Sequence, residues 1–312
     1  MAHPLTPLKT PGNRLAGFIA VIALLISMVG FQPRSFAQQG KVKVISYNIW
    51  NGFEWGKDQE RKEEMIRWVK TQQPDVLALQ ELCGYTPEKL REDAKKWGHS
   101  YAEILKTSGY PVGITSSKPI KINEKILENM HHGALHCSTW GIDFMVVHFS
   151  PFSYKKRHEE AKIVLAKLDE IRQEQDKVIV LGDFNALSPF DADLYKNRTE
   201  VLEKRRASEK EHDHVRNLQD GQLEYGVIAS FLGFPLLDVV QRHTTTWDDR
   251  VSCPTQVFEE KKGEGRKPGS TRIDYILTSP ELATKCIQAK VLNEEETYYL
   301  SDHYPVVAEF QF

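Results

Sequence analysis

Five short apolar runs in this sequence each contain, or lie next to, a residue that can bind a metal ion or transfer a proton. Runs of this length and composition are typical of buried β-strands. A buried carboxylate is costly in free energy unless it is paired or binds a cation. The sequence therefore predicts that these side chains converge on one site. They are Glu81, His148, Asp183, Asp274, Asp302 and His303.

These residue types suit the hydrolysis of a phosphate ester. A phosphodiester is anionic and repels hydroxide, so a hard divalent cation is needed to neutralise it and to polarise the phosphorus. Mg²⁺ favours one or two carboxylates plus water, which fits Glu81 and Asp302 better than a histidine cage would. Asn185 and His148 are donors that can meet the charge that grows in the transition state. No serine or cysteine nucleophile is required.

Taken singly, several of these residues have simpler explanations. A buried aspartate such as Asp274 is more often a structural hydrogen-bond acceptor, and a lone His148 is more often a satisfied core histidine. Asn48 could simply cap a turn. The joint pattern favours one catalytic site, because a purely structural explanation would have to account for the polar residue at each strand end separately. In such a site, Asp274 would fix the tautomer of His303 and favour its cationic form.

The N-terminus has the features of an export signal. Lys9 and Arg14 precede the uncharged stretch 15–31, and Ser35-Phe36-Ala37 supplies small residues where a signal peptidase needs them. We interpret residues 1–37 as a secretory signal peptide, with an uncleaved N-terminal anchor as the alternative. In both cases the basic residues stay inside and the remainder is secreted or extracytoplasmic.

Residues 38–312 are expected to form one catalytic domain, because no linker, repeat or low-complexity tract divides them. The chain has 312 residues, of which 40% are hydrophobic and 27% charged, as in ordinary globular proteins. Its net charge is −2, and removal of residues 1–37 would make it more negative. This argues against tight, charge-driven binding of nucleic acid, but it leaves room for a nuclease that holds its substrate briefly.

The four cysteines could form two disulfides in an oxidising compartment, and three connectivities would satisfy them. Their spacing does not resemble a zinc site. A disulfide at Cys83 could brace Glu81, and a buried free thiol there is equally compatible with the sequence. The cysteines are Cys83, Cys137, Cys253 and Cys286.

The periodicity of the chain favours an α+β layered fold over a doubly wound one. Residues 41–46 alternate like an exposed edge strand. Helices are expected over 59–70, from a Thr86 cap to about Gly98, and over 155–175. Residues 187–242 look like helices joined by polar loops.

Four further clusters are more ambiguous. His212-Asp213-His214 looks like a metal site but is better explained as a solvated helix face. His131-His132 is expected in a turn near the site, with no role assigned. Residues 247–250 could contact substrate or form a surface turn. The basic, glycine-rich segment 261–269 is expected to be a solvated connector.

Taken in order, six motifs resemble the endonuclease/exonuclease/phosphatase superfamily of metal-dependent phosphoesterases. The resemblance spans nearly the whole exported part and implies a four-layer α/β/β/α sandwich. Its two packed, mainly antiparallel sheets are flanked by helices, with the active site at one end. The motifs are Tyr47-Asn48, Leu79-Gln80-Glu81, His148-Phe149-Ser150-Pro151, Gly182-Asp183-Phe184-Asn185-Ala186, Ile273-Asp274-Tyr275 and Ser301-Asp302-His303-Tyr304-Pro305-Val306.

The resemblance also implies a metal site. Glu81 would be the principal ligand, and Asn48 and Asp302 would complete or support its shell. The expected ion is Mg²⁺, with Mn²⁺ or Ca²⁺ as alternatives.

Around that metal, the resemblance gives each remaining motif residue a catalytic role. Asp183 would orient and deprotonate the attacking water, and Asn185 would hold a phosphate oxygen. His148 and His303 would stabilise charge on the phosphoryl group, with Asp274 holding His303.

The expected function is an exported Mg²⁺-dependent phosphodiesterase acting on nucleic acid, a phospholipid or a small phosphoester. The nearest local likeness is to secreted pancreatic-type deoxyribonucleases. Those enzymes have an arginine shortly after the metal-binding glutamate, where this chain has Leu82-Cys83-Gly84. We expect a monomer, because no obligate protein partner is evident.

Three other functions stay open. They are a sphingomyelinase-like lipid phosphodiesterase, a phosphomonoesterase and, more remotely, a non-catalytic binding protein on the same fold. A lipid enzyme should expose an aromatic hairpin near its site, and the only candidate in the sequence is Phe231 to Leu237. That run is too densely apolar to leave in water and is better explained as core.

Overall fold

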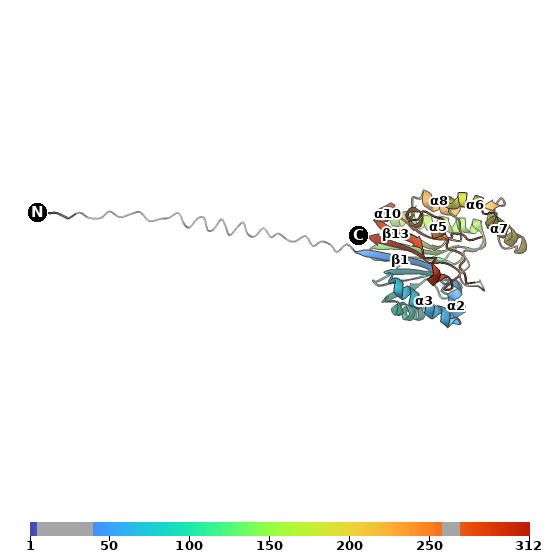
Figure 1. Ribbon diagram of the computed structural model, residues 1–312, viewed down its shortest axis with the longest axis horizontal. Coiled ribbons are helices and arrows are strands. Elements are labelled where there is room, and N and C mark those ends of the chain that lie inside the picture. Colours follow the sequence, from blue (N-terminus) through green and yellow to red (C-terminus); the bar gives the residue numbers. More distant parts are fainter. Residues whose placement is uncertain (5–39, 258–268) are drawn as a thin grey trace. The chain divides into compact units, whose positions relative to one another are not determined.

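The apolar runs of the sequence become the strands of two six-stranded sheets (Figure 1). The computed structural model describes residues 1–4, 40–257 and 269–312, and Gly40–Phe312 form one unit. The segment interpreted as a signal peptide or anchor lies outside the described residues, except for its first four. The loop expected over 261–269 is also outside them, apart from its last residue.

The first sheet has the strand order β13-β14-β1-β2-β4-β3. Strands β1 and β2 run parallel, and every other neighbouring pair is antiparallel. Its strands are β1 Lys41–Asn48, β2 Val76–Gln80, β3 Tyr101–Ile104, β4 Gly113–Ser116, β13 Cys286–Val291 and β14 Val306–Gln311.

The second sheet repeats this plan with the order β11-β12-β8-β7-β6-β5, and here β7 and β8 are the parallel pair. A separate two-stranded ribbon joins β9 Leu218–Gln219 and β10 Gln222–Leu223. The strands of the second sheet are β5 Lys121–Ile126, β6 Ala134–Thr139, β7 Ile142–His148, β8 Val178–Asp183, β11 Leu237–Asp238 and β12 Asp274–Thr278.

Helices cover the two outer faces (Figure 1). The longer ones are α3 Gln59–Gln72, α4 Pro87–Lys96, α5 Tyr154–Arg172, α7 Thr199–Glu211 and α8 Gly226–Gly233. The shorter ones are α2 Trp50–Gly56, α6 Ala192–Lys196, α9 Val239–His243 and α10 Pro280–Lys285, with 3₁₀ turns η1 Pro189–Asp191, η2 Asp248–Arg250 and η3 Glu295–Thr297.

Three apolar clusters hold these layers together. The cluster between the sheets contains buried residues of both, such as Val44 and Phe144. The outer face of the first sheet packs on α3 and α4, where Val69 and Leu90 are buried, and the second sheet packs on α5 and α8. Each fully buried side chain of this size stabilises the fold by roughly 1.5–3 kcal/mol. The α/β/β/α sandwich is therefore confirmed.

A side-chain cap starts each of the three predicted helices, and the cap at Thr86 is the one predicted. The Asp58 side chain accepts a hydrogen bond from the backbone N–H of Arg61 at the start of α3. The Thr86 and Ser153 side chains cap α4 and α5 in the same way. These caps satisfy backbone donors that a helix end leaves unpaired.

The exposed-edge prediction for residues 41–46 is wrong. Strand β1 is paired on both sides and is buried from Val44 onward. Its partner β2 begins opposite Val44, so Lys41 and Lys43 extend beyond it. The alternation of polar and apolar residues therefore reflects the end of an inner strand that extends beyond its neighbour.

The disulfide expectation is also wrong, because all four cysteines are free thiols. Cys83 and Cys286 are buried, and burial raises their thiol pKa to about 12 and about 11, respectively. A thiol with a raised pKa forms little thiolate and is unreactive.

Among the described residues, no helix has the length and apolar character needed to cross a membrane.

Candidate active site

Strand register within each sheet aligns several of the predicted residues at one edge. Parallel strands end at the same edge, so Asn48 lies beside Gln80 in the first sheet, and His148 lies beside Asp183 in the second. Asp274 is the first residue of β12 and pairs with Asp183 in antiparallel register. The polar ends of inner strands from both sheets therefore lie together.

Asn48 connects the two sheets. Its Nδ2 donates to Glu81 Oε1 and to Asp183 Oδ2, each at 3.2 Å. Its Oδ1 accepts a bond from the backbone N–H of Trp50 at 3.1 Å. Because the amide oxygen is already bonded, the geometry favours Asn48 as a group that positions the carboxylates.

Glu81 is held in an unusual backbone conformation just beyond β2. Its φ is +62°, in the left-handed region that glutamate rarely adopts. Its Oε2 accepts a bond of 2.6 Å from the N–H of Asn51. Residues 51–55 in α2 also have left-handed φ values, between +51° and +59°. Such conformations concentrate at functional sites, and no local sequence pattern marks this one.

Asp183 lies at the centre of the polar groups. Its Oδ1 accepts a bond from the Asn185 N–H at 2.8 Å. Its Oδ2 is 3.6 Å from His148 Nε2 and 3.8 Å from His303 Nε2. Burial and the nearby Asp274 carboxylate raise the pKa of Asp183 to about 8. A carboxyl with a pKa near neutrality can exchange protons with water at little cost.

The two histidines have opposite electrostatic settings. His303 Nδ1 is 2.8 Å from Asp274 Oδ2, and although burial opposes the cation, Asp274 and its neighbours raise the His303 pKa well above its ordinary value. Burial and the His303 charge lower the pKa of His148 to about 3. One imidazole is therefore a cation and the other a neutral hydrogen-bonding group at neutral pH.

Asp302 belongs to the same group of charges. Burial raises its pKa, and the negative charge of Glu81 adds to that shift. Ser301 fixes this corner by donating through its Oγ to the backbone oxygen of Asn48 at 2.7 Å. Asn185 is fixed by its Nδ2, which donates to the Phe149 oxygen at 3.0 Å. The structure thus brings together all eight residues predicted for the site.

The donor set fits a hard divalent cation. The negative charge of Glu81 raises the pKa of Asp183 and of Asp302, and a bound cation would offset that repulsion. Ligand atoms of Asp183, Asp274 and His303 also lie within 4.8 Å of one another. Of these, Asp274 and His303 already bond to each other, so Glu81 and Asp302 are the better candidates for the principal ligands.

A pocket of about 350 Å³ opens over these groups. Four of its residues, Tyr110, His131, His132 and Phe152, were missed by sequence reasoning or left without a role. The ring of His132 stacks on His148 with centroids 4.1 Å apart, whereas Tyr110 and Phe152 come from loops with no motif to mark them. The pocket is lined by Glu81, Tyr110, His131, His132, His148, Pro151, Phe152, Asp183, Asn185 and His303.

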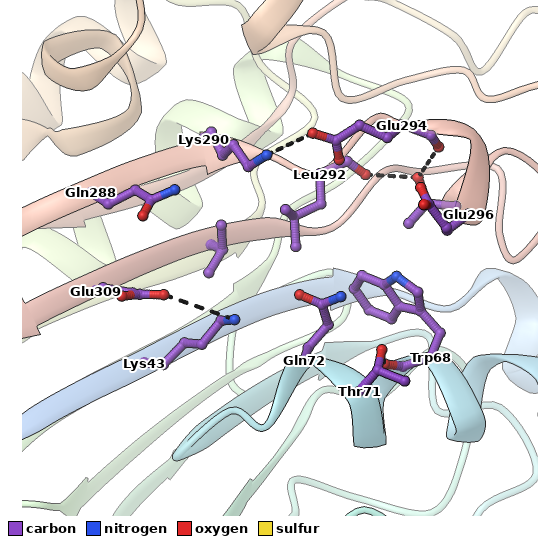
Figure 2. A pocket seen from close by; sticks show the side chains of 12 residues that line it. Lys43, Trp68, Thr71, Gln72, Gln288, Lys290, Leu292, Glu294, Glu296 and Glu309 are labelled. Carbon is purple, nitrogen blue, oxygen red and sulfur yellow. Dashed lines mark hydrogen bonds and ion pairs between the residues drawn. The ribbon is translucent and has the colours of Figure 1, made fainter.

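A larger pocket of about 590 Å³ lies on the outer side of the first sheet, next to α3 (Figure 2). Its charged groups pair with one another, as in the contacts of Lys43 with Glu309 and of Lys290 with Glu294. None of the predicted catalytic residues lines it. The chemistry therefore belongs to the smaller pocket.

The remaining ambiguous clusters have structural settings. His212 to His214 form an exposed turn just after α7, so the predicted solvation is right and the predicted helix is wrong. Trp247 packs against Tyr195 with ring centroids 5.3 Å apart, and Arg250 pairs with Asp191 at 2.9 Å. These contacts favour the surface-turn interpretation of residues 247–250.

This fold and site define a metal-dependent phosphoesterase. The chain belongs to the Endonuclease/Exonuclease/phosphatase family, whose sequence profile matches residues 45–303. It is accordingly a hydrolase that cleaves phosphate ester bonds. No curated protein matches it in sequence.

Solved structures share the fold at 20% identity. An AP endonuclease from Archaeoglobus fulgidus superposes with a TM-score of 0.62, covering 86% of this chain and 99% of that one. A variant of the 3' phosphatase NExo from Neisseria, bound to product DNA hairpin, gives 0.63 with coverages of 87% and 100%. The 3'-5' exonuclease NExo from Neisseria meningitidis gives 0.61 with the same coverages.

Proposed function

We propose that this protein is an exported, Mg²⁺-dependent phosphodiesterase that cleaves nucleic acid. The observation that supports it most is the bonding of Asn48 to Glu81 of one sheet and to Asp183 of the other. That contact joins a metal-binding carboxylate and a water-activating carboxylate in one pocket. The structurally similar proteins described as an AP endonuclease and a 3'-5' exonuclease support nucleic acid as the substrate.

In this proposal Glu81 and Asp302 would hold the cation, and a bound cation would supply charge neutralisation and polarisation at the phosphate. Asp183 orients the attacking water and accepts its proton. His303, kept cationic by Asp274, donates to a non-bridging phosphate oxygen, and neutral His148 donates through Nε2. Asn185 would hold another phosphate oxygen when it turns from the Phe149 carbonyl.

A lipid substrate has less support. Phe231 is fully buried in α8, and Leu236 is buried as well, so the candidate for a membrane hairpin belongs to the core. A phosphomonoesterase activity on a 3' end has one supporting observation, because a neighbouring structure is described as a 3' phosphatase.

A substrate panel tests the proposal. Purified protein is incubated with single-stranded DNA, RNA, a 3'-phosphorylated oligonucleotide, sphingomyelin and a small phosphomonoester, with Mg²⁺ or with a chelator. We expect cleavage of the nucleic acids only with Mg²⁺. An Asp183→Asn preparation, purified identically, excludes a contaminating nuclease. Sphingomyelin as the sole substrate would favour the lipid alternative, and no turnover of any compound would overturn the proposal.

Export is proposed from the N-terminal sequence alone. N-terminal sequencing of protein recovered outside the cytoplasm tests it. A first residue of Gln38 supports a cleaved signal, and an intact Met1 supports the anchor. Recovery only from the cytoplasm would contradict both.

A further inference from the structure

Aromatic side chains form a continuous arc around the mouth of the catalytic pocket. Neighbouring rings are in contact, with centroid distances of 6.1 Å for Trp55 and Tyr110, 5.4 Å for Tyr110 and His132, and 4.3 Å for His132 and His131. The series continues through Phe152, at 5.4 Å from His131 and 5.0 Å from His214. We call these six residues the aromatic arc: Trp55, Tyr110, His131, His132, Phe152 and His214.

The arc is assembled from five separate segments. Trp55 lies in α2, Tyr110 between β3 and β4, and Phe152 between β7 and α5. The two adjacent histidines lie between β5 and β6, and His214 follows α7. Because segments from both sheets contribute, the arc is not a by-product of one amphipathic element.

Several of these rings remain open to solvent. Trp55 is 50% exposed, Phe152 39% and Tyr110 36%. Most contacts between the rings are edge-to-face rather than stacked. Exposed aromatic groups that gather at one place mark a binding surface rather than a core. Tyr110 and Phe152 also line the catalytic pocket, so the arc and the phosphate-cleaving groups share one space.

The chemistry of the arc favours flat polar rings over acyl chains. Three of its six members are histidines, whose ring nitrogens can form hydrogen bonds. Burial is the main cause that lowers the pKa of His131. The positive charges of Lys106 and Lys156 lower it further, so both lysines lie near the arc. A ligand with flat rings on either side of an anionic diester matches this combination, and such a ligand is a nucleic acid strand.

We propose that the aromatic arc stacks the unpaired bases that flank the scissile phosphate, which makes single-stranded nucleic acid or a frayed strand end the substrate. A base inside a duplex has no free face, whereas unpaired bases stack readily on aromatic side chains. Lys106 and Lys156 would meet the neighbouring phosphates. This inference rests on the proposed nuclease function and adds that the strand is unpaired where it is cleaved.

The test compares two oligonucleotides of equal length, one normal and one with stable abasic residues on both sides of the cleaved linkage. Wild-type protein should show a KM about a hundredfold lower for the normal strand, because the abasic strand loses the stacked bases on both sides of the linkage. Phe152→Ala and Tyr110→Ala should each raise the KM for the normal strand by about tenfold with little change in kcat. Neither substitution should change the KM for the abasic strand. Tyr110→Phe should behave as wild type.

Tyr101→Ala is the matched control. Tyr101 is 41% exposed and lies on β3 of the same hairpin, but at the end away from the loop that holds Tyr110. This variant should leave both KM values unchanged. The same comparison with RNA strands distinguishes the two kinds of nucleic acid.

A binding measurement separates this inference from the proposed function. Fluorescence anisotropy with Asp183→Asn protein needs no turnover. It should show tighter binding of the normal strand, and adding Phe152→Ala should reduce that preference by about tenfold. Equal binding of the two strands would overturn the inference even if both are cleaved. Sedimentation with sphingomyelin vesicles that depends on Phe152, without any preference for bases, would also overturn it and favour a membrane surface.

Discussion

Asp183 is the residue on which the proposed chemistry depends most. It accepts bonds from Asn48 and Asn185, and it lies within 4 Å of His148 and His303. Its raised pKa follows from burial and from Asp274. In the absence of a cation this carboxyl is therefore partly protonated near neutral pH, and a bound cation would favour its ionised form.

Replacing Asp183 with asparagine should separate catalysis from folding. We expect kcat/KM to fall by roughly 10²–10⁴-fold, because the amide cannot accept a proton from water. The free energy of unfolding should change by only about 1 kcal/mol, because the amide keeps a hydrogen-bonding group in place. Nuclease assays and urea unfolding measure the two quantities.

Asp213→Asn provides the control for this substitution. Asp213 lies in the exposed turn after α7, so neither activity nor stability should change. Nuclease activity of Asp183→Asn equal to that of wild type would remove the assigned role of Asp183.

At the scale of elements, the left-handed segment of α2 holds the Glu81 side chain through the bond from the Asn51 N–H to Glu81 Oε2. Left-handed backbone costs roughly 1–2 kcal/mol per non-glycine residue, so tertiary contacts must hold this segment. The buried Arg61 guanidinium does so by donating to the backbone oxygens of Ile49, Trp50 and Leu300. Gly52 lies inside the segment with φ of +56° and packs directly against Cys83.

Gly52→Ala should therefore be strongly destabilising. A Cβ at this position would lie 2.1 Å from the backbone oxygen of Cys83, so the loop that follows Glu81 would have to move. We expect a loss of about 2 kcal/mol or more in the free energy of unfolding. Activity measured well below the unfolding midpoint should also fall, because Glu81 moves with that loop.

Gly56→Ala is the matched control, because Gly56 also has positive φ but nothing lies within 4 Å of an added Cβ. Only backbone strain applies there, and the expected loss is about 1 kcal/mol. Equal destabilisation by the two substitutions would show that contact with Cys83 is unimportant.

Strands and helices with strong local signals were predictable from the sequence. The apolar runs before Glu81, His148 and Asp183 are strands, and the Thr86 cap starts a helix. The conformation of residues 51–55 was not predictable, because it depends on Arg61 and Cys83 rather than on local preference. The inner position of β1 was missed for a similar reason, since pairing with β2 and β14 is a long-range property.

For the whole molecule, the polar residues of the site were predictable from the sequence, whereas the aromatic arc was not. Asn48 is the last residue of β1 and Asp274 the first of β12. Strand pairing places Asp274 opposite Asp183, and Asn48 bonds to Asp183 across the two sheets. Tyr110 and Phe152 lie in irregular loops, so their positions depend on how both sheets pack. The sequence motifs therefore indicate the type of reaction, whereas the geometry of the loops is needed to infer whether the substrate strand is paired.

The central claim is that two sheets place Glu81, Asp183 and Asp302 around one divalent cation that is required for phosphodiester cleavage. The most direct test is a chelation and recovery assay on a single-stranded oligonucleotide. We predict that activity stops when a chelator removes the metal and returns when excess Mg²⁺ is added, while Glu81→Gln stays inactive at the same Mg²⁺ concentration. Undiminished cleavage in the presence of chelator, or full activity of Glu81→Gln, would contradict the claim.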